Sequence, residues 1–163
     1  MEAQLPVWLE AAESVARAAG KRIREAHEQR NVSFHVEHKG PTMKHVDLVT
    51  ALDKECEELI ISQLRQKFPD HCFLGEESSA VAGAGPLALA EAPTWIIDPL
   101  DGTTNFVHGY PLVTVSIGLA VAGELVLGVI FNPLMDELCS ATKGGGTTLN
   151  GSRVRVGEAG GVG

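Results

Sequence analysis

The stretch VTVSIGLAVAGELVLGVIF, residues 113–131, decides the fold. In its first half, apolar residues alternate with small or polar ones, which is the period of a strand with one buried face. Ala122-Gly123 then allows a tight turn, and the second half continues as another strand. The segment therefore predicts an antiparallel hairpin. Its apolar positions are Val113, Val115, Ile117, Leu119 and Val121, followed by Leu125, Leu127, Val129 and Phe131.

Two helices are predicted before this hairpin. Apolar residues recur at helical spacing from Leu5 to Arg30, and again from about Leu52 to Phe68. Thr50 is a candidate N-cap of the second helix, and the Pro-Asp pair after Phe68 ends it. Between the helices, Val32 to His38 alternates apolar and polar residues and predicts a strand.

Shorter apolar runs predict the remaining strands. Cys72–Leu74 and Trp95–Ile97 precede the hairpin, and Leu138–Ala141 and Arg153–Val156 follow it. Ser78 to Ala92 is small and glycine-rich, which indicates a loop with some helix. Because helices come first and an antiparallel meander follows, we expect an α+β fold with helices packed on a largely antiparallel sheet.

The overall charge excludes some classes of partner. The 163 residues carry a formal net charge of −8, which argues against nucleic acid or an anionic membrane as the main partner. No apolar run approaches the ~18 residues of a membrane span. The acidic, amphipathic N-terminus does not resemble a signal peptide, so we expect a cytoplasmic protein. Phosphate substrates stay possible, since a metal ion can reverse the local charge.

Three cysteines, Cys56, Cys72 and Cys139, are widely spaced and form no CxxC pair. An odd number at such spacing makes a disulfide framework improbable and suits a reducing compartment. We expect all three to be small buried residues.

The densest chemistry lies in DPLDGTTNF, residues 98–106. Pro99 favours extended geometry at Asp98, and a turn after it would let Asp101 converge with Asp98. Two carboxylates and the carbonyl of Leu100 are hard oxygen ligands of the kind that Mg²⁺ prefers. Gly102 lets a phosphate approach the backbone, and Thr103 begins what looks like a short helix whose free N–H groups can hold an oxyanion.

A surface turn is the alternative for this segment, because Asp, Pro, Gly and Thr all form turns. The preceding run Trp95–Ile97 should be buried, and carboxylates at the end of a buried strand need partners. We therefore favour a site over a turn at Asp98 and Asp101.

Two further acidic positions are ambiguous. Glu76 follows the apolar run Cys72–Leu74 and can add a ligand to the same metals, but exposed glutamates are common. Asp53 stands three residues after Thr50, which is the spacing of a capping box, so spacing alone favours a helix cap there. The histidines form no cluster, and we expect a structural role for His108.

Four segments in this order resemble the motifs of the inositol monophosphatase family. The match extends from about Trp8 to Val156. The run 35–40, with Gly109-Tyr110-Pro111, looks closest to plant and algal members, which are linked to inositol-phosphate and L-galactose 1-phosphate hydrolysis. The four segments are Asp47 to Asp53, Gly75 to Ser78, Asp98 to Phe106, and Asn150-Gly151.

The resemblance implies a role for each residue. Glu76, Asp98 and the Leu100 carbonyl would bind a first Mg²⁺, and Asp98 and Asp101 would contribute to a second. Gly102, Thr103 and Asp101 would contact the substrate, with the amides of Gly102 and Thr103 on the phosphate. Thr103, supported by Asp53, would help Glu76 orient and deprotonate the attacking water, which replaces the cap as the preferred role of Asp53.

The implied activity is Mg²⁺-dependent, lithium-sensitive hydrolysis of a sugar or cyclitol phosphate by metal-activated water, in a family of homodimers. The implied fold is the layered α/β sandwich of the sugar phosphatases. Residues 1–163 would be its N-terminal catalytic subdomain, without the C-terminal subdomain that supplies a further metal-binding aspartate. The alternatives are a non-catalytic metal-binding fragment or dimerisation partner, and a phosphatase resembling the bisphosphate nucleotidases or fructose bisphosphatases.

Overall fold

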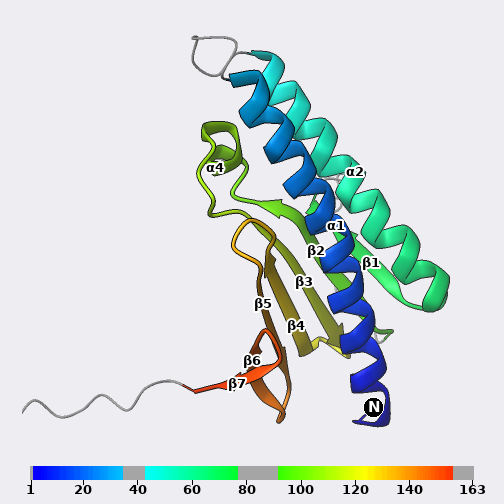
Figure 1. Ribbon diagram of the computed structural model, residues 1–163. Coiled ribbons are helices and arrows are strands. Elements are labelled where there is room, and N and C mark those ends of the chain that lie inside the picture. Colours follow the sequence, from blue (N-terminus) through cyan, green and yellow to red (C-terminus); the bar gives the residue numbers. More distant parts are fainter. Residues whose placement is uncertain (1, 35–42, 77–91, 156–163) are drawn as a thin grey trace, which may run out of the picture.

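The strands form one continuous sheet in the computed structural model, which describes residues 2–34, 43–76 and 92–155 (Figure 1). Within these residues the sheet has seven strands, ordered as they occur in the chain. Only β1 and β2 are parallel, and every later pair is antiparallel. The strands are β1 Cys72–Gly75, β2 Thr94–Asp101, β3 Thr114–Val121, β4 Glu124–Asn132, β5 Glu137–Thr142, β6 Gly146–Leu149 and β7 Ser152–Val154.

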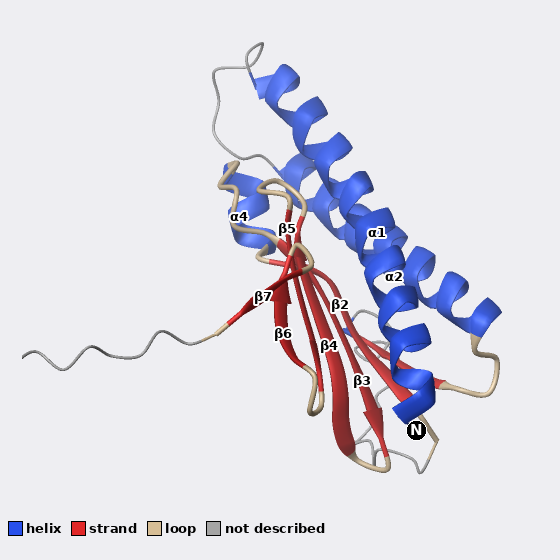
Figure 2. Ribbon diagram, turned by 60° about the horizontal axis from the view of Figure 1, so that its bottom comes forward, coloured by secondary structure: helices blue, strands red, loops and turns tan. Residues whose placement is uncertain are grey.

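Two long helices cover one face of this sheet (Figures 1 and 2). A short 3₁₀ helix, η1 Glu2–Gln4, leads into α1 Leu5–Phe34, and α2 is Met43–Lys67. α1 packs on β3, β4 and β5, while α2 lies beside α1 and packs on β2. A short helix, α4 Thr103–His108, follows β2 and contacts α2. The predicted α+β arrangement is confirmed.

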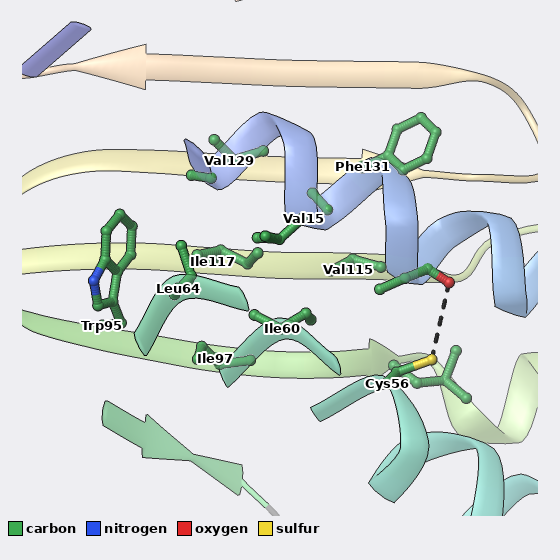
Figure 3. Close-up of a cluster of buried hydrophobic side chains, with 14 of the residues drawn as sticks. Val15, Cys56, Ile60, Leu64, Trp95, Ile97, Val115, Ile117, Val129 and Phe131 are labelled. Carbon is green, nitrogen blue, oxygen red and sulfur yellow. Dashed lines mark hydrogen bonds between the residues drawn. The ribbon is translucent and has the colours of Figure 1, made fainter. Parts of the chain in front are cut away.

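The core lies between the helix pair and the sheet (Figure 3). It forms because each helix has one apolar stripe and each central strand one apolar face, and burying them together removes both from water. Trp95 is fully buried, and its indole N–H donates to Nδ1 of His71 at 3.0 Å. The side chains that Figure 3 labels are Val15, Cys56, Ile60, Leu64, Trp95, Ile97, Val115, Ile117, Val129 and Phe131.

Both helices are longer than the sequence pattern predicts. α1 continues to Phe34, so the strand predicted from Val32 is wrong at 32–34, and 35–38 lie outside the described residues. α2 begins at Met43, so Thr50 lies inside the helix and the predicted N-cap is wrong. Extending a helix adds one hydrogen bond per residue once it is nucleated, so short ambiguous stretches join it.

The sequence pattern also misses a strand. Gly146–Leu149 forms β6, although its glycine and threonines suggest only a spacer between strands. Asn150, with φ 49°, closes the turn into β7. Its Oδ1 accepts from the Leu138 N–H at 2.8 Å, and its Nδ2 donates to the Asp136 carbonyl at 2.9 Å. The loop expected at 78–92 falls almost wholly outside the described residues.

The cysteines differ in their surroundings, and all three are free thiols. Cys56 is fully buried with its Sγ 3.9 Å from the Ala19 carbonyl oxygen, and burial raises the pKa of its thiol to about 12. Cys139 is half-buried, but Cys72 is exposed at the start of β1, so the expectation of burial is wrong there. In the described ranges, no helix combines the length and apolarity that crossing a membrane requires.

A bulge in the central hairpin decides which residues of β4 face the core. Leu119 pairs with Leu127, but Ala120 pairs with Leu125, so Val126 is the extra residue. Strict alternation would place Leu125 on the same face as Leu127. Instead Val126 is buried, and the side chain of Leu125 is 63% exposed.

This bulge makes two neighbouring residues respond very differently to truncation. We expect Val126→Ala to lower the free energy of unfolding by roughly 2 kcal/mol, because it removes buried methyl groups. Leu125→Ala, which removes more carbon atoms, should change it by less than ~0.5 kcal/mol. Urea unfolding of both variants measures this, and a larger loss for Leu125→Ala would contradict the bulged register.

Candidate active site

One carboxylate follows the end of β1, and another lies within the neighbouring parallel strand β2. The register pairs Gly75 of β1 with Ile97 of β2, so the next residues, Glu76 and Asp98, emerge side by side. Residues paired in register point to the same side of a sheet, and both strands run in the same direction. Parallel pairing therefore brings together two acidic residues that are 22 positions apart in the sequence.

A bulge brings a third carboxylate to the same face. Asp98 pairs with Ser116 and Asp101 with Thr114, so β2 advances three residues while β3 advances two. In a regular strand, residues three apart point to opposite faces, but one extra residue puts both on one face. Pro99 lacks an N–H and is tolerated at such an irregularity. The predicted convergence of Asp98 and Asp101 thus occurs within a bulged strand and not at a turn that ends it.

Gly102 connects β2 to α4 in a conformation that suits glycine. Its φ is 88°, and a Cβ there would lie 2.7 Å from the carbonyl oxygen of Leu112. The Asn105 amide donates to the same Leu112 oxygen at 2.7 Å, and Phe106 is fully buried beneath α4. The first turn of α4, starting at Thr103, is therefore held in place from two sides.

α2 supplies a further buried carboxylate. Asp53 is only 8% exposed and lies in the interior of α2, ten residues after the helix begins at Met43. A capping box requires a helix start at Thr50, so the cap interpretation of Asp53 is wrong. The sequence pattern misplaced the helix start, and for that reason it misjudged the surroundings of Asp53.

All the residues singled out by the sequence line one cavity of about 490 Å³. His108, expected to be structural, also lines it, and its Nδ1 lies 3.3 Å from the Thr104 carbonyl oxygen. Nothing in the sequence pattern placed Val49 or Val107 in the site. The lining residues are Val49, Thr50, Asp53, Glu76, Asp98, Leu100, Asp101, Gly102, Thr103, Thr104, Val107 and His108.

The carboxylates in this cavity repel one another. The pKa of Asp98 is raised to about 6, first by burial and then by the negative charges of Glu76 and Asp101. A hydrogen bond from the Leu100 N–H acts in the opposite direction. A cation placed among these oxygens would relieve both the burial cost and the repulsion.

The donor set suits a hard cation that keeps part of its water shell. Carboxylate and carbonyl oxygens match Mg²⁺, which usually binds through one or two carboxylates, waters and substrate phosphate. In 2–34, 43–76 and 92–155, no three acidic, histidine or cysteine side chains gather closely enough to hold an ion alone. A cation here would therefore also need backbone, water or phosphate oxygens.

Known proteins resemble this chain in sequence and in fold. The model of the inositol monophosphatase family matches residues 4–161. The chain belongs to the inositol monophosphatase family. The family resemblance noted from the motifs is thus confirmed.

Individual relatives agree with the family match. Inositol monophosphatase 2 of Solanum lycopersicum is 50% identical over 149 residues, which are 91% of this chain and 53% of the tomato protein. The structure of inositol monophosphatase from Anabaena has a TM-score of 0.74 at 34% identity, covering 96% of this chain and 52% of that chain. A structure of SaIMPase-II with 2′-AMP bound has a TM-score of 0.70 at 30% identity, covering 88% and 48%. The chain spans about half the length of these relatives.

The raised pKa of Asp98 predicts a pH dependence of stability in the absence of metal. Between about pH 4 and about pH 6 the folded protein keeps a proton on Asp98 that the unfolded chain releases. The contribution of Asp98 to the free energy of unfolding therefore falls as pH rises through this window. Urea unfolding in EDTA should show it as a wild-type stability that declines relative to Asp98→Asn. A parallel pH dependence of the two proteins would contradict the raised pKa, and Asp70→Asn, at an exposed position, is the control.

The geometry at Gly102 predicts a specific cost of adding a methyl group. Gly123 also has a left-handed backbone, with φ 77°, but a Cβ there meets nothing within 4 Å. Gly123→Ala should therefore cost only the backbone strain of about 1–2 kcal/mol. Gly102→Ala should cost more, because the Leu112 carbonyl must also move. Thermal and urea unfolding compare the two, and equal losses would show that the contact with Leu112 carries no cost.

Proposed function

We propose that this chain carries the metal- and phosphate-binding part of a Mg²⁺-dependent phosphatase for a sugar or cyclitol phosphate monoester. The substrate class is inositol 1-phosphate or L-galactose 1-phosphate. The observation that supports this most is the convergence of Glu76, Asp98 and Asp101 in one cavity with Gly102 and Thr103. Three acidic residues beside the backbone of Gly102 and Thr103 suit a phosphate that binds together with a cation.

Glu76, Asp98, Asp101 and the Leu100 carbonyl would hold the metal. Bound Mg²⁺ would supply positive charge against the phosphate and lower the pKa of the attacking water. Asp98 must be ionised to bind a cation, so its raised pKa makes metal binding weaker below about pH 6. Asp101 is exposed and remains accessible to the substrate as well as to the metal.

Gly102 and Thr103 would bind the phosphate through their backbone N–H groups. Gly102 has no side chain to keep an oxyanion away, and the contacts of Asn105 hold this segment still. The buried carboxylate of Asp53 would hold the Thr103 hydroxyl, which would orient the water. Glu76 is exposed, lines the cavity and would accept the proton from that water.

The proposal keeps further expectations that rest on family resemblance alone. These are inhibition by lithium, a homodimeric full-length enzyme and a cytoplasmic location. We also propose that the whole protein recognises the sugar or cyclitol group of the substrate. This stays a proposal because the chain spans only about half the length of its relatives.

A nucleotide phosphate is the second candidate substrate. It is favoured by the structure of SaIMPase-II with 2′-AMP bound, since the part of that protein that aligns with this chain is 30% identical to it. A cavity built around phosphate and metal makes few demands on the group that carries the phosphate. Substrate comparison therefore has to include 2′-AMP beside the sugar phosphates.

Release of inorganic phosphate tests the proposal directly. With Mg²⁺ present, we expect hydrolysis of inositol 1-phosphate or L-galactose 1-phosphate, and at least about a 100-fold loss in Asp98→Asn, which removes a proposed metal ligand. Asp70→Asn makes the same chemical change at an exposed position outside the cavity and should keep full activity.

The pattern of results separates the candidates. Faster turnover of 2′-AMP than of inositol 1-phosphate or L-galactose 1-phosphate would favour a nucleotide phosphate as the substrate. If calorimetry shows Mg²⁺ binding but no substrate is hydrolysed, the chain is a non-catalytic metal-binding fragment. Equal activity of wild type and Asp98→Asn would overturn the assignment of this cavity as the catalytic site.

A further inference from the structure

Glu57 is a buried carboxylate that the proposed mechanism does not use. It lies on α2 one turn after Asp53, on the same side of the helix, and it is 5% exposed. Burying a carboxylate is costly unless polar groups receive it, so an ordinary packing position would carry an apolar residue. Its location therefore calls for a specific explanation.

The Glu57 carboxylate packs directly against Gly75 at the end of β1. A Cβ built on Gly75 would lie 2.3 Å from Oε2, 2.4 Å from Cδ and 2.7 Å from Oε1 of Glu57. The φ of Gly75 is not in the left-handed region, so backbone conformation does not require glycine there. The close approach of the carboxylate requires it instead.

This contact is one residue away from the proposed site. Gly75 is the last residue of β1, and Glu76, which follows it directly, lines the cavity together with Asp53 of α2. Gly75 is also the residue of β1 that pairs with Ile97, directly before Asp98. Any shift of Gly75 therefore changes how Glu76 stands relative to Asp98.

We propose that Glu57 is a positioning residue, whose carboxylate against Gly75 holds the end of β1 so that Glu76 faces Asp98. The inference rests on the proposed function for the role of Glu76 as a metal ligand. It adds that α2 sets the geometry of this ligand through the end of β1. A purely structural Glu57 would support folding without affecting how tightly the folded protein binds a cation.

Calorimetry with Mg²⁺ in the presence of inorganic phosphate distinguishes these roles, at a temperature where circular dichroism shows each protein folded. We expect Glu57→Gln, which keeps the shape but removes the charge, to weaken Mg²⁺ binding about 10- to 100-fold. Gly75→Ala should weaken it similarly, and the double variant should be no worse than the stronger single one. Glu58→Gln, next along α2 but exposed, should stay within about twofold of wild type.

Hydrogen exchange on the metal-free protein gives a second readout that needs no ligand. Faster exchange in residues 72–76 of Glu57→Gln, with β3 and β4 unchanged, supports the inference. If Glu57→Gln does not fold, Glu57→Asp and Gly75→Ala replace it in both measurements. A folded variant that binds Mg²⁺ like wild type overturns the positioning role and leaves the proposed function intact. No binding by wild type removes the proposed function and this inference with it.

Discussion

The parallel hydrogen bonding between β1 and β2 is the constraint on which the cavity depends. It pairs Gly75 with Ile97, and so places Glu76, directly after β1, beside Asp98 within β2. In the described part of the sheet this is the one parallel pair, and every other strand follows the simpler antiparallel meander. Parallel neighbours cannot be joined by a tight turn, so a longer connection must run between β1 and β2. The two residues that this pairing brings together, Glu76 and Asp98, both line the cavity.

Irregularities in the backbone complete what the strand pairing begins. The bulge between Asp98 and Asp101 turns two carboxylates to one face, and the left-handed Gly102 turns the chain directly into α4. Neither irregularity disturbs the core, because Leu100 and Phe106 on either side are buried. Apolar anchors thus alternate with chemically active positions along a single short segment. With this spacing, the sheet carries the residues of the proposed site while its buried residues stay packed.

The acidic cavity works against the stability of the fold that holds it. Its carboxylates repel one another, and this repulsion together with burial raises the pKa of Asp98. The apolar layer between the helices and the sheet offsets this cost. A cation would turn the repulsion into attraction, so metal binding and folding stability are coupled in such a site. Excess negative charge in the chain as a whole has the same sign as the charge at the cavity.

Sequence alone was enough for the class of fold and for the acidic segment. The spacing of apolar residues predicted the long helices and the central hairpin. The segment DPLDGTTNF predicted oxygen ligands for a metal and a backbone segment that could bind phosphate. Both predictions were possible because each depends on residues close together in the sequence. Tertiary structure decided the rest. Because α2 begins at Met43, Asp53 is a buried residue inside the helix and not part of a cap. The bulge in β4 buries Val126 and leaves Leu125 exposed. The carboxylate of Glu57 on α2 packs against Gly75 on β1. The spacing of apolar residues along the sequence shows which residues share a face of a helix or strand. Strand register, bulges and contacts between elements depend instead on how distant segments pack against one another. No single segment of the sequence contains that information.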